Sequence, residues 1–333
     1  MYLSPSVSRR YFLRNTGMGA MAFTFPQMIF SAVNLLDRPV KLGLIADLHQ
    51  DIMHDGLSRM QAFVREMEVQ RPDAIIQLGD FAYPNEKNRP VIDLFNNAHR
   101  ESLHVIGNHD TDAGHTKEQC LNIWKMPAPY YAKDIAGIKI LVLDGNETGS
   151  PTHKGGYVSY IGKEQLAWLE AELEAANTPV LIISHQPLAG TIAVDNATEI
   201  QDLLSRYASK IMLAVNGHSH IDDLLCIGRV SYLHLNSASY YWVGGKYEHL
   251  SYSADIHRDH PWISHTCPYR DSLFATLILD PENQTIRLEG RTSAWLGPSP
   301  AKLGSNASPD LNVGEEIAPH IRQRTIELIA AGE

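Results

Sequence analysis

The chain of 333 residues contains little cysteine. Its three cysteines, Cys120, Cys226 and Cys267, lie far apart, and none belongs to a C-x-x-C motif. This pattern argues against a thiolate metal site, and it allows one disulfide without identifying the pair. The chain also lacks the G-x-S-x-G and C-x5-R signatures, so neither of these serine and cysteine nucleophiles is present.

Basic residues are in the minority. The chain has 28 Lys and Arg against 38 Asp and Glu, for a net charge of −10. Residues 1–33 contain three of the arginines and no acid, which leaves 25 basic residues, 38 acidic residues and a net charge of −13 for the remainder. An acidic body argues against a long nucleic-acid partner, because phosphate backbones are bound through Lys and Arg. We therefore expect no nucleic acid as a partner.

The first residues resemble an export signal. Residues 8–14, SRRYFLR, are similar to the twin-arginine motif, a moderately apolar stretch follows, and the first acidic residue is Asp37. We interpret residues 1–33 as a twin-arginine signal segment, which predicts a periplasmic or otherwise exported protein. Two alternatives are an uncleaved membrane anchor, which would be the only membrane contact, and a cytosolic amphipathic helix.

Apolar strands alternate with helical patterns along residues 40–215. We predict helices over 57–70, 90–97, 117–124, 163–176 and 197–208, and the alternation implies crossover connections in a mainly parallel sheet. Beyond residue 220 the pattern favours antiparallel strands within 224–242 and 273–290. Residues 297–312 are rich in Pro, Ser, Gly and Asn and predict a linker, and the chain end predicts a short amphipathic helix.

Five polar blocks follow apolar runs in a fixed order. The carboxyl ends of parallel strands open onto one rim of a sheet, so residues far apart in sequence can meet there. The blocks offer Asp, His and Asn ligands, which suit hard or borderline divalent metals, and seven such candidates exceed the four ligands of a typical zinc site. The blocks are Asp47-Leu48-His49, Gly79-Asp80, Gly107-Asn108-His109-Asp110, Ser184-His185 and Gly217-His218-Ser219-His220.

This order of blocks resembles the calcineurin-like metallophosphoesterase superfamily, which carries D-x-H, G-D, G-N-H-[D/E], a lone H and G-H-x-H. The resemblance implies an α/β fold, a four-layer αββα sandwich with mixed sheets. It divides the chain into the signal segment 1–33, a catalytic domain over 38–296, and a linker with a C-terminal helix over 297–333. In this arrangement Asp80 bridges two ions, one held by Asp47, His49 and His220 and the other by Asn108, His185 and His218.

The resemblance also gives His109 a catalytic role, the protonation of the leaving oxygen or the steadying of the phosphoryl group. We expect Asp110 to orient His109. The alternative is that His109 only braces its loop. Asp51 and Asp112 are interpreted as solvated or supporting residues and not as ligands.

The predicted function is an exported, dinuclear metal-dependent phosphoesterase. It would hydrolyse a phosphodiester, pyrophosphate or phosphomonoester bond by direct attack of metal-bound hydroxide, with two Mn, Fe or Zn ions as cofactors. The expected partner is a small phosphoester, nucleotide-like in one interpretation, and the oligomeric state stays open. The alternatives are a metal-binding scaffold or receptor without catalysis, and a phospholipid or cell-wall phosphodiester as substrate.

Finer features divide the possible branches. The blocks and the helix near 157–169 resemble cyclic-nucleotide diesterases, purple-acid-phosphatase-like proteins and manganese-dependent ADP-ribose pyrophosphatases. Tyr83 occurs in G-D-x-x-Y, the spacing of the tyrosine ligand of purple acid phosphatases, although those enzymes usually lack a histidine ligand at the position of His49. Residues 240–242 either stack on a substrate or belong to the core, and residues 255–270 form a candidate lid, with Arg270 as a candidate phosphate contact.

Overall fold

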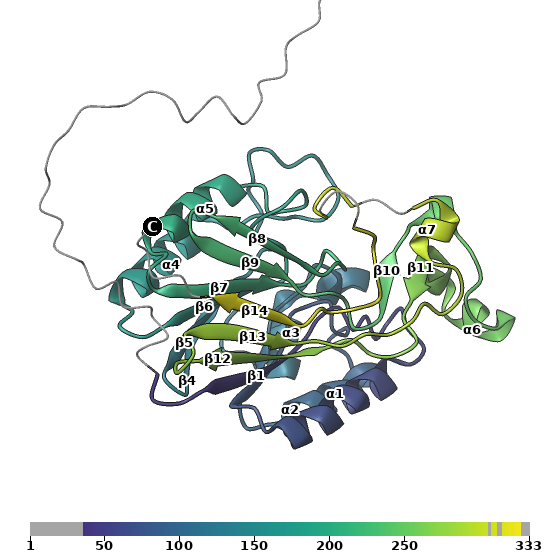
Figure 1. Cartoon of the computed structure of the whole chain (residues 1–333). Coiled ribbons are helices and arrows are strands. Elements are labelled where there is room, and N and C mark those ends of the chain that lie inside the picture. The colour runs from purple at the N-terminus through teal and green to yellow at the C-terminus, as the bar shows by residue number, and fades with distance from the viewer. Residues whose placement is uncertain (1–35, 306–307, 312–314, 328–333) are drawn as a thin grey trace, which may run out of the picture.

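The computed structural model describes residues 36–305, 308–311 and 315–327, and two six-stranded mixed sheets form its centre (Figure 1). The predicted signal segment 1–33 lies outside these residues. The first sheet has the order β14-β13-β12-β1-β2-β3 and the second the order β4-β5-β6-β7-β9-β8. The strands of the first sheet are β1 (Val40–Ile45), β2 (Ala74–Gln77), β3 (Ser102–His104), β12 (Ala275–Asp280), β13 (Thr285–Glu289) and β14 (Arg324–Glu327). Those of the second are β4 (Tyr131–Ile135), β5 (Ile138–Val142), β6 (Val180–Ser184), β7 (Ile211–Asn216), β8 (Asp223–Ile227) and β9 (Val230–His234).

Helices cover the outer face of each sheet. Helices α1 (Gly56–Gln70) and α2 (Arg89–Ala98) lie on the side of the first sheet, and α4 (Lys163–Ala175) and α5 (Ala197–Arg206) on the side of the second (Figure 1). Together with α3 (Lys117–Trp124), these five helices confirm the helices predicted from the sequence to within two residues at each end. The four layers confirm the predicted αββα sandwich.

The apolar runs of the central strands are buried on both faces, as expected for parallel strands between two layers. In β6, Leu181 and Ile183 pack into the core shared by the two sheets, whereas Val180 and Ile182 pack under α4 and α5. The parallel pairs β1–β2–β3 and β5–β6–β7–β9 therefore bring several strand ends to the same side of the molecule.

The strands beyond residue 220 are antiparallel where the sequence predicted it. β8 pairs with β9, and β12 pairs with β13. Between them, β10 (Tyr240–Trp242) and β11 (Thr266–Pro268) form a small two-stranded sheet. This sheet carries α6 (Ala254–Asp259) and the 3-10 helices η4 (Gly245–Tyr247) and η5 (Pro261–His265) beside the sandwich (Figure 1).

The end of the chain corrects one prediction. Residues Arg324–Glu327, which we expected in an amphipathic helix, form strand β14 and pair antiparallel with β13. The helix prediction was wrong because the edge of β13 offers unpaired backbone groups, and the β-branched Thr325 and Ile326 fit an extended strand better than a helix. The predicted linker also contains a short helix, α7 (Pro300–Leu303).

Cys120 and Cys267 are buried, Cys226 is exposed, and none of the three forms a disulfide. Among the described residues, no helix combines the length and the apolar character needed to cross a membrane.

Candidate metal centre

The five polar blocks lie directly after strands β1, β2, β3, β6 and β7, at the carboxyl ends of both sheets. The first loop is joined to the second by backbone hydrogen bonds from Asp47 N to Gly79 O (3.1 Å) and from His49 N to Asp80 O (2.9 Å). The last block is joined to the first because the backbone N–H of His218 donates to both carboxylate oxygens of Asp47, at 3.0 and 3.1 Å. The blocks thus form one connected rim.

The backbone of this rim is strained. Five of the seven predicted ligands have a positive φ between 48° and 65°, a region that non-glycine residues rarely occupy. Such conformations cost about 1–3 kcal/mol each and persist only where the surroundings enforce them, as at functional sites. These residues are Asp47, His49, Asp80, His218 and His220.

One ligand group consists of Asp47, His49 and His220, whose candidate ligand atoms all lie within 4.8 Å of one another. His220 Nε2 is 3.2 Å from Asp47 Oδ1, and His49 Nε2 is 4.0 Å from the same oxygen. The Nε2 atoms of His49 and His220 approach to 3.2 Å. All three side chains are buried.

A second group consists of Asp80, His185 and His218, again with ligand atoms within 4.8 Å. His185 Nε2 lies 3.2 Å from Asp80 Oδ2 and 3.1 Å from Asn108 Oδ1, so the predicted amide ligand lies at the same point. His218 Nδ1 is 3.3 Å from His185 Nε2. Asp80 Oδ2 is also 3.6 Å from His49 Nε2, which places this carboxylate between the two groups.

This donor set fits two cations. Ring nitrogens face each other in both groups, and carboxylate oxygens point to the same places, as is expected where several donors share an ion. Among the described residues, the ion-pair partners of Asp47 and Asp80 are histidines, and no Lys or Arg neutralises either carboxylate. All seven predicted ligands therefore converge, in two groups like those that the family resemblance implies. That they bind metal stays a prediction.

The imidazole of His185 is oriented for ligation. Its Nδ1 is 2.8 Å from the carbonyl oxygen of Leu78, so Nδ1–H donates there and Nε2 is directed to Asp80 and Asn108. A hydrogen bond from the other ring nitrogen is the usual way in which proteins fix a metal-binding histidine. In the same region Gly79 has φ +97°, and a Cβ atom at this position would collide with the ring of His185.

Burial and charge shift the titration of these groups. Burial alone would lower the pKa of His185, but the neighbouring Asp80 outweighs it and raises that pKa to about 9. Burial would likewise raise the pKa of Asp80, but His185 and His109 hold it well below its usual value. Burial lowers the pKa of His218 to about 3 and that of His49 well below its ordinary value. Asp80 is therefore ionised and two of the imidazoles are neutral, the states in which such groups bind metals.

His109 lies beside the two groups but is oriented by a different acid from the one we predicted. Its Nδ1 is 2.8 Å from Asp112 Oδ2, and Tyr157 Oη lies 3.1 Å from the same nitrogen. The prediction that Asp110 orients His109 was wrong. The sequence contained a partial signal for Asp112, because an acid three residues after a histidine can reach it within one turn, whereas nothing in the sequence pointed to Tyr157.

Asp110 instead holds the loops together. Its carboxylate accepts backbone N–H bonds from Gly107 (2.7 Å), Asp80 (2.9 Å), Phe81 (2.8 Å) and Ala82 (3.2 Å). Burial and repulsion from Asp80 raise the pKa of Asp110 to about 8, against the opposing effect of these donors. Asp110 thus connects the loops that carry Asp80 and Asn108, and no contact of its side chain with His109 is observed.

A further set of polar residues supports the Asn108 loop from the second sheet. Asn146 Nδ2 donates to the carbonyl oxygen of Ile106 (2.9 Å), and Gln186 and Lys117 hold Asn146 in turn. Lys117 also forms a short ion pair with Asp144. Residues 144–147 therefore brace the rim from the second sheet.

The aromatic residues near the site divide into two kinds. Tyr240 is buried, with its ring 4.9 Å from that of His49 and 5.0 Å from that of His220, so it packs against the ligands. Trp242, by contrast, is 42% exposed.

Burial and nearby acids raise the pKa of Tyr83 to about 12. That Tyr83 is a metal ligand stays a prediction. The same holds for a lid over residues 255–270 and for a phosphate contact by the exposed Arg270.

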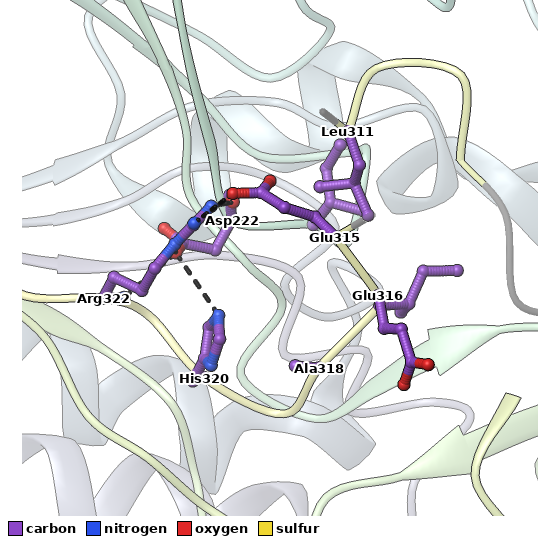
Figure 2. Close-up of a pocket in the computed structure, with 9 residues that line it drawn as sticks. Asp222, Leu311, Glu315, Glu316, Ala318, His320 and Arg322 are labelled. Atoms are coloured by element: carbon purple, nitrogen blue, oxygen red, sulfur yellow. Dashed lines mark hydrogen bonds and ion pairs between the residues drawn. The ribbon is translucent and has the colours of Figure 1, made fainter. Parts of the chain in front are cut away.

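The block that carries His218 and His220 is anchored from behind by the end of the chain. Asp222, two residues after His220, accepts a hydrogen bond from Arg322 Nε (2.8 Å), and its Oδ2 lies 3.7 Å from His320 Nε2 (Figure 2). Arg324 Nη1 donates to the same carboxylate at 2.7 Å. Asn236 Nδ2 donates to the carbonyl oxygens of Ala318 and His320. Asp222, Ala318, His320 and Arg322 border a cavity of about 360 Å³ (Figure 2).

Comparison with known proteins agrees with this geometry. A family model described as calcineurin-like phosphoesterase matches residues 40–222, more than half of the chain. No relative among curated proteins matches it. Among solved structures, a dimetal phosphatase from Danio rerio is 16% identical, with 79% of this chain and all of that chain covered and a TM-score of 0.55. GAP50, described as the anchor in the inner membrane complex of Plasmodium, is 13% identical, with 86% and 90% covered and a TM-score of 0.50. The chain belongs to the calcineurin-like phosphoesterase family.

Proposed function

We propose that this protein is an exported, dinuclear metal-dependent phosphoesterase that hydrolyses a diester, pyrophosphate or monoester bond of a small phosphoester substrate. The observation that carries the proposal is the convergence of seven nitrogen and oxygen donors into two adjacent groups joined by Asp80. A scaffold that only binds metal needs the ligands alone. The presence of His109 next to them, held by an acid, favours an enzyme.

The residues would divide the work as follows. Asp47, His49 and His220 would hold one ion, Asn108, His185 and His218 the other, and Asp80 would contact both. When bound, two divalent ions would activate water and bind the phosphoryl oxygens. Mn, Fe and Zn all suit these donors. His109 would donate a proton to the leaving oxygen or steady the phosphoryl group, a contribution worth about 10²–10⁴ in rate.

Export is a separate part of the proposal, and it depends on residues 8–14. Replacing Arg9 and Arg10 by lysine keeps the charge but removes the twin-arginine motif. We expect the wild-type chain in the periplasmic fraction of a host with this route and the double variant in the cytoplasm. Equal distribution of the two chains would contradict the export proposal and leave the enzymatic one intact.

The activity is tested by hydrolysis of bis(p-nitrophenyl) phosphate and p-nitrophenyl phosphate. The protein is loaded in turn with manganese, zinc and iron, and Asn108→Ala is compared with the exposed His153→Ala as a matched control. We expect metal-dependent turnover that Asn108→Ala loses and His153→Ala keeps, and the ratio of the two rates distinguishes a diesterase from a monoesterase. Two bound ions without turnover of either ester would favour the metal-binding scaffold.

A further inference from the structure

The side of His109 away from the ligands is held by residues from two separate loops. Asp112 belongs to the 3-10 helix η3 (His109–Gly114), and Tyr157 lies in the long connection between β5 and α4. Asp112 Oδ2 is 2.8 Å from His109 Nδ1 and 2.7 Å from the hydroxyl of Tyr157. One carboxylate oxygen therefore accepts hydrogen bonds from both side chains.

The hydrogen-bond chemistry fixes the state of the imidazole. A carboxylate only accepts hydrogen bonds, so His109 must carry a hydrogen on Nδ1, and the Tyr157 hydroxyl must donate to the same oxygen. This leaves Nε2 of His109 as the ring nitrogen that faces a ligand or substrate. The acid thus selects one tautomer of the imidazole.

Ring packing fixes the orientation as well. The ring of Tyr157 meets that of His109 edge to face, at 4.8 Å and 60°. The ring of His49, a predicted ligand, lies 5.3 Å from His109 at 70°. The imidazole of His109 therefore lies between a metal ligand and the tyrosine.

The fold itself does not depend on these contacts. The side chains of His109 and Asp112 are 35% and 28% exposed, and Tyr157 is 50% exposed. Hydrogen bonds between such exposed groups contribute little to stability. Within η3 the backbone leaves the helical region at Asp112, with ψ 170°, and this conformation accompanies the contact of its carboxylate with His109.

We propose that Asp112 and Tyr157 are positioning residues, which together hold the Nδ1–H of His109 so that Nε2 is presented to the leaving oxygen. A proton carried on Nε2 passes to that oxygen, and the ring is left as the neutral Nδ1–H tautomer that Asp112 holds. This inference rests on the proposed function. Asp112 makes the direct contact, and Tyr157 holds Asp112 and covers the outer face of the imidazole. Because Tyr157 comes from a different loop, that loop takes part in the reaction without supplying a metal ligand.

The test uses esters with different leaving groups. Protonation of the leaving oxygen matters most for a poor leaving group, so phenyl esters are compared with p-nitrophenyl esters in Asp112→Asn and Tyr157→Phe, with Tyr130→Phe as a remote control. For the phenyl ester we expect kcat to fall about 100-fold in Asp112→Asn and about 10-fold in Tyr157→Phe, within the range of general acid catalysis. For the p-nitrophenyl ester we expect kcat to fall by less than about 3-fold in both variants, with KM unchanged.

A double-mutant cycle separates positioning from other effects. In a His109→Ala background neither substitution should lower kcat further, because the residue on which they act is gone. Equal losses with both esters, or losses that persist in the His109→Ala background, would overturn the inference.

A readout independent of turnover keeps this inference apart from the proposed function. Nitrogen-15 NMR of the zinc-loaded protein, at a pH where the His109 ring is neutral, should show the Nδ1–H tautomer in the wild type and a mixture of tautomers in both variants. The same spectrum in wild type and variants would overturn the inference. If the wild type hydrolyses none of the esters, the proposed function fails, while the NMR result still decides whether the pair fixes the tautomer.

Discussion

Two buried acidic clusters lie on either side of the block that ends at His220, and they neutralise their charge in different ways. At the back, the side chain of Asp222 is 2% exposed and forms an ion pair with Arg322 (Figure 2). It also forms an ion pair with Arg324. On the rim, Asp47 and Asp80 are equally buried, but their ion-pair partners among the described residues are histidines. Burying a carboxylate is costly unless it is paired with a cation.

This difference shows which cluster is built for stability and which for binding. A guanidinium is permanently charged and fills the position opposite Asp222, so that cluster is complete within the chain. An imidazole is neutral or charged depending on its surroundings, and when neutral it offers a lone pair to a metal. The rim thus has the donors and the negative charge for cations, and the back cluster holds the ligand block in place.

The largest expected effect comes from the carboxylate between the two ligand groups. Asp80→Asn keeps the shape of the side chain but removes the charge shared by both groups. We expect hydrolysis of bis(p-nitrophenyl) phosphate to fall by more than about 100-fold, since loss of even an outer partner of a metal ligand costs 10–100-fold. The measurement is kcat/KM of the metal-loaded variant.

The control for this variant is Asp222→Asn, the same substitution in the back cluster. Its activity should stay within about 10-fold of the wild type, because the Asp222 carboxylate is bonded to Arg322 and Arg324 and not to a predicted ligand. Equal losses in the two variants would remove the distinction between the clusters.

The next effect is on stability. Replacing both Arg322 and Arg324 by methionine leaves Asp222 buried without its cations, and breaking a buried pair in this way costs about 3–5 kcal/mol. We expect the free energy of unfolding, measured with urea, to fall by about 3 kcal/mol or more. Arg258→Met, which breaks exposed ion pairs with Asp255 and Asp259, should leave it close to the wild-type value, because exposed ion pairs contribute little. Similar values for the two variants would contradict the structural role of the back cluster.

A smaller effect concerns His104, a buried histidine that is not a predicted metal ligand. His104 accepts a hydrogen bond from Gln77 Nε2 at Nδ1 (3.0 Å) and donates from Nε2 to Asn96 Oδ1 (2.7 Å), so it is neutral. Burial lowers its pKa to about 3, from an ordinary value of 6.5. Below pH 6.5 the unfolded chain binds a proton here that the folded chain does not, so stability should fall as the pH drops from 6.5 towards 3.

This contribution amounts to about 1.4 kcal/mol per pH unit at most. It is measured as the slope of the unfolding free energy against pH. His104→Gln should lower that slope by the amount that corresponds to about one bound proton. The exposed His153→Gln is the control and should leave the slope unchanged. An unchanged slope in His104→Gln would show that His104 titrates normally in the folded protein.

The sequence predicted the parts of this molecule that depend on local periodicity. Helices such as α3 and α4 follow from apolar spacing, and the five blocks meet because parallel strands must end on the same side. The seven predicted ligands converge for that reason.

What the sequence did not predict depends on contacts between distant or irregular segments. The choice of Asp112 over Asp110 as the partner of His109 is set by the backbone torsions of one turn. Tyr157 reaches His109 from a loop without periodicity, 48 residues away. The pairing of β14 with β13 depends on a free sheet edge formed elsewhere in the fold, and for that reason a helix was predicted in its place.

The number of metal ions bound per chain tests the central claim most directly. The protein is loaded with zinc or manganese, freed of excess metal by dialysis and measured by mass spectrometry of the elements. We predict two ions per chain in the wild type, two in Asp222→Asn, and one or none in Asp80→Asn. Metal-free wild type, or two ions retained in Asp80→Asn, would contradict it.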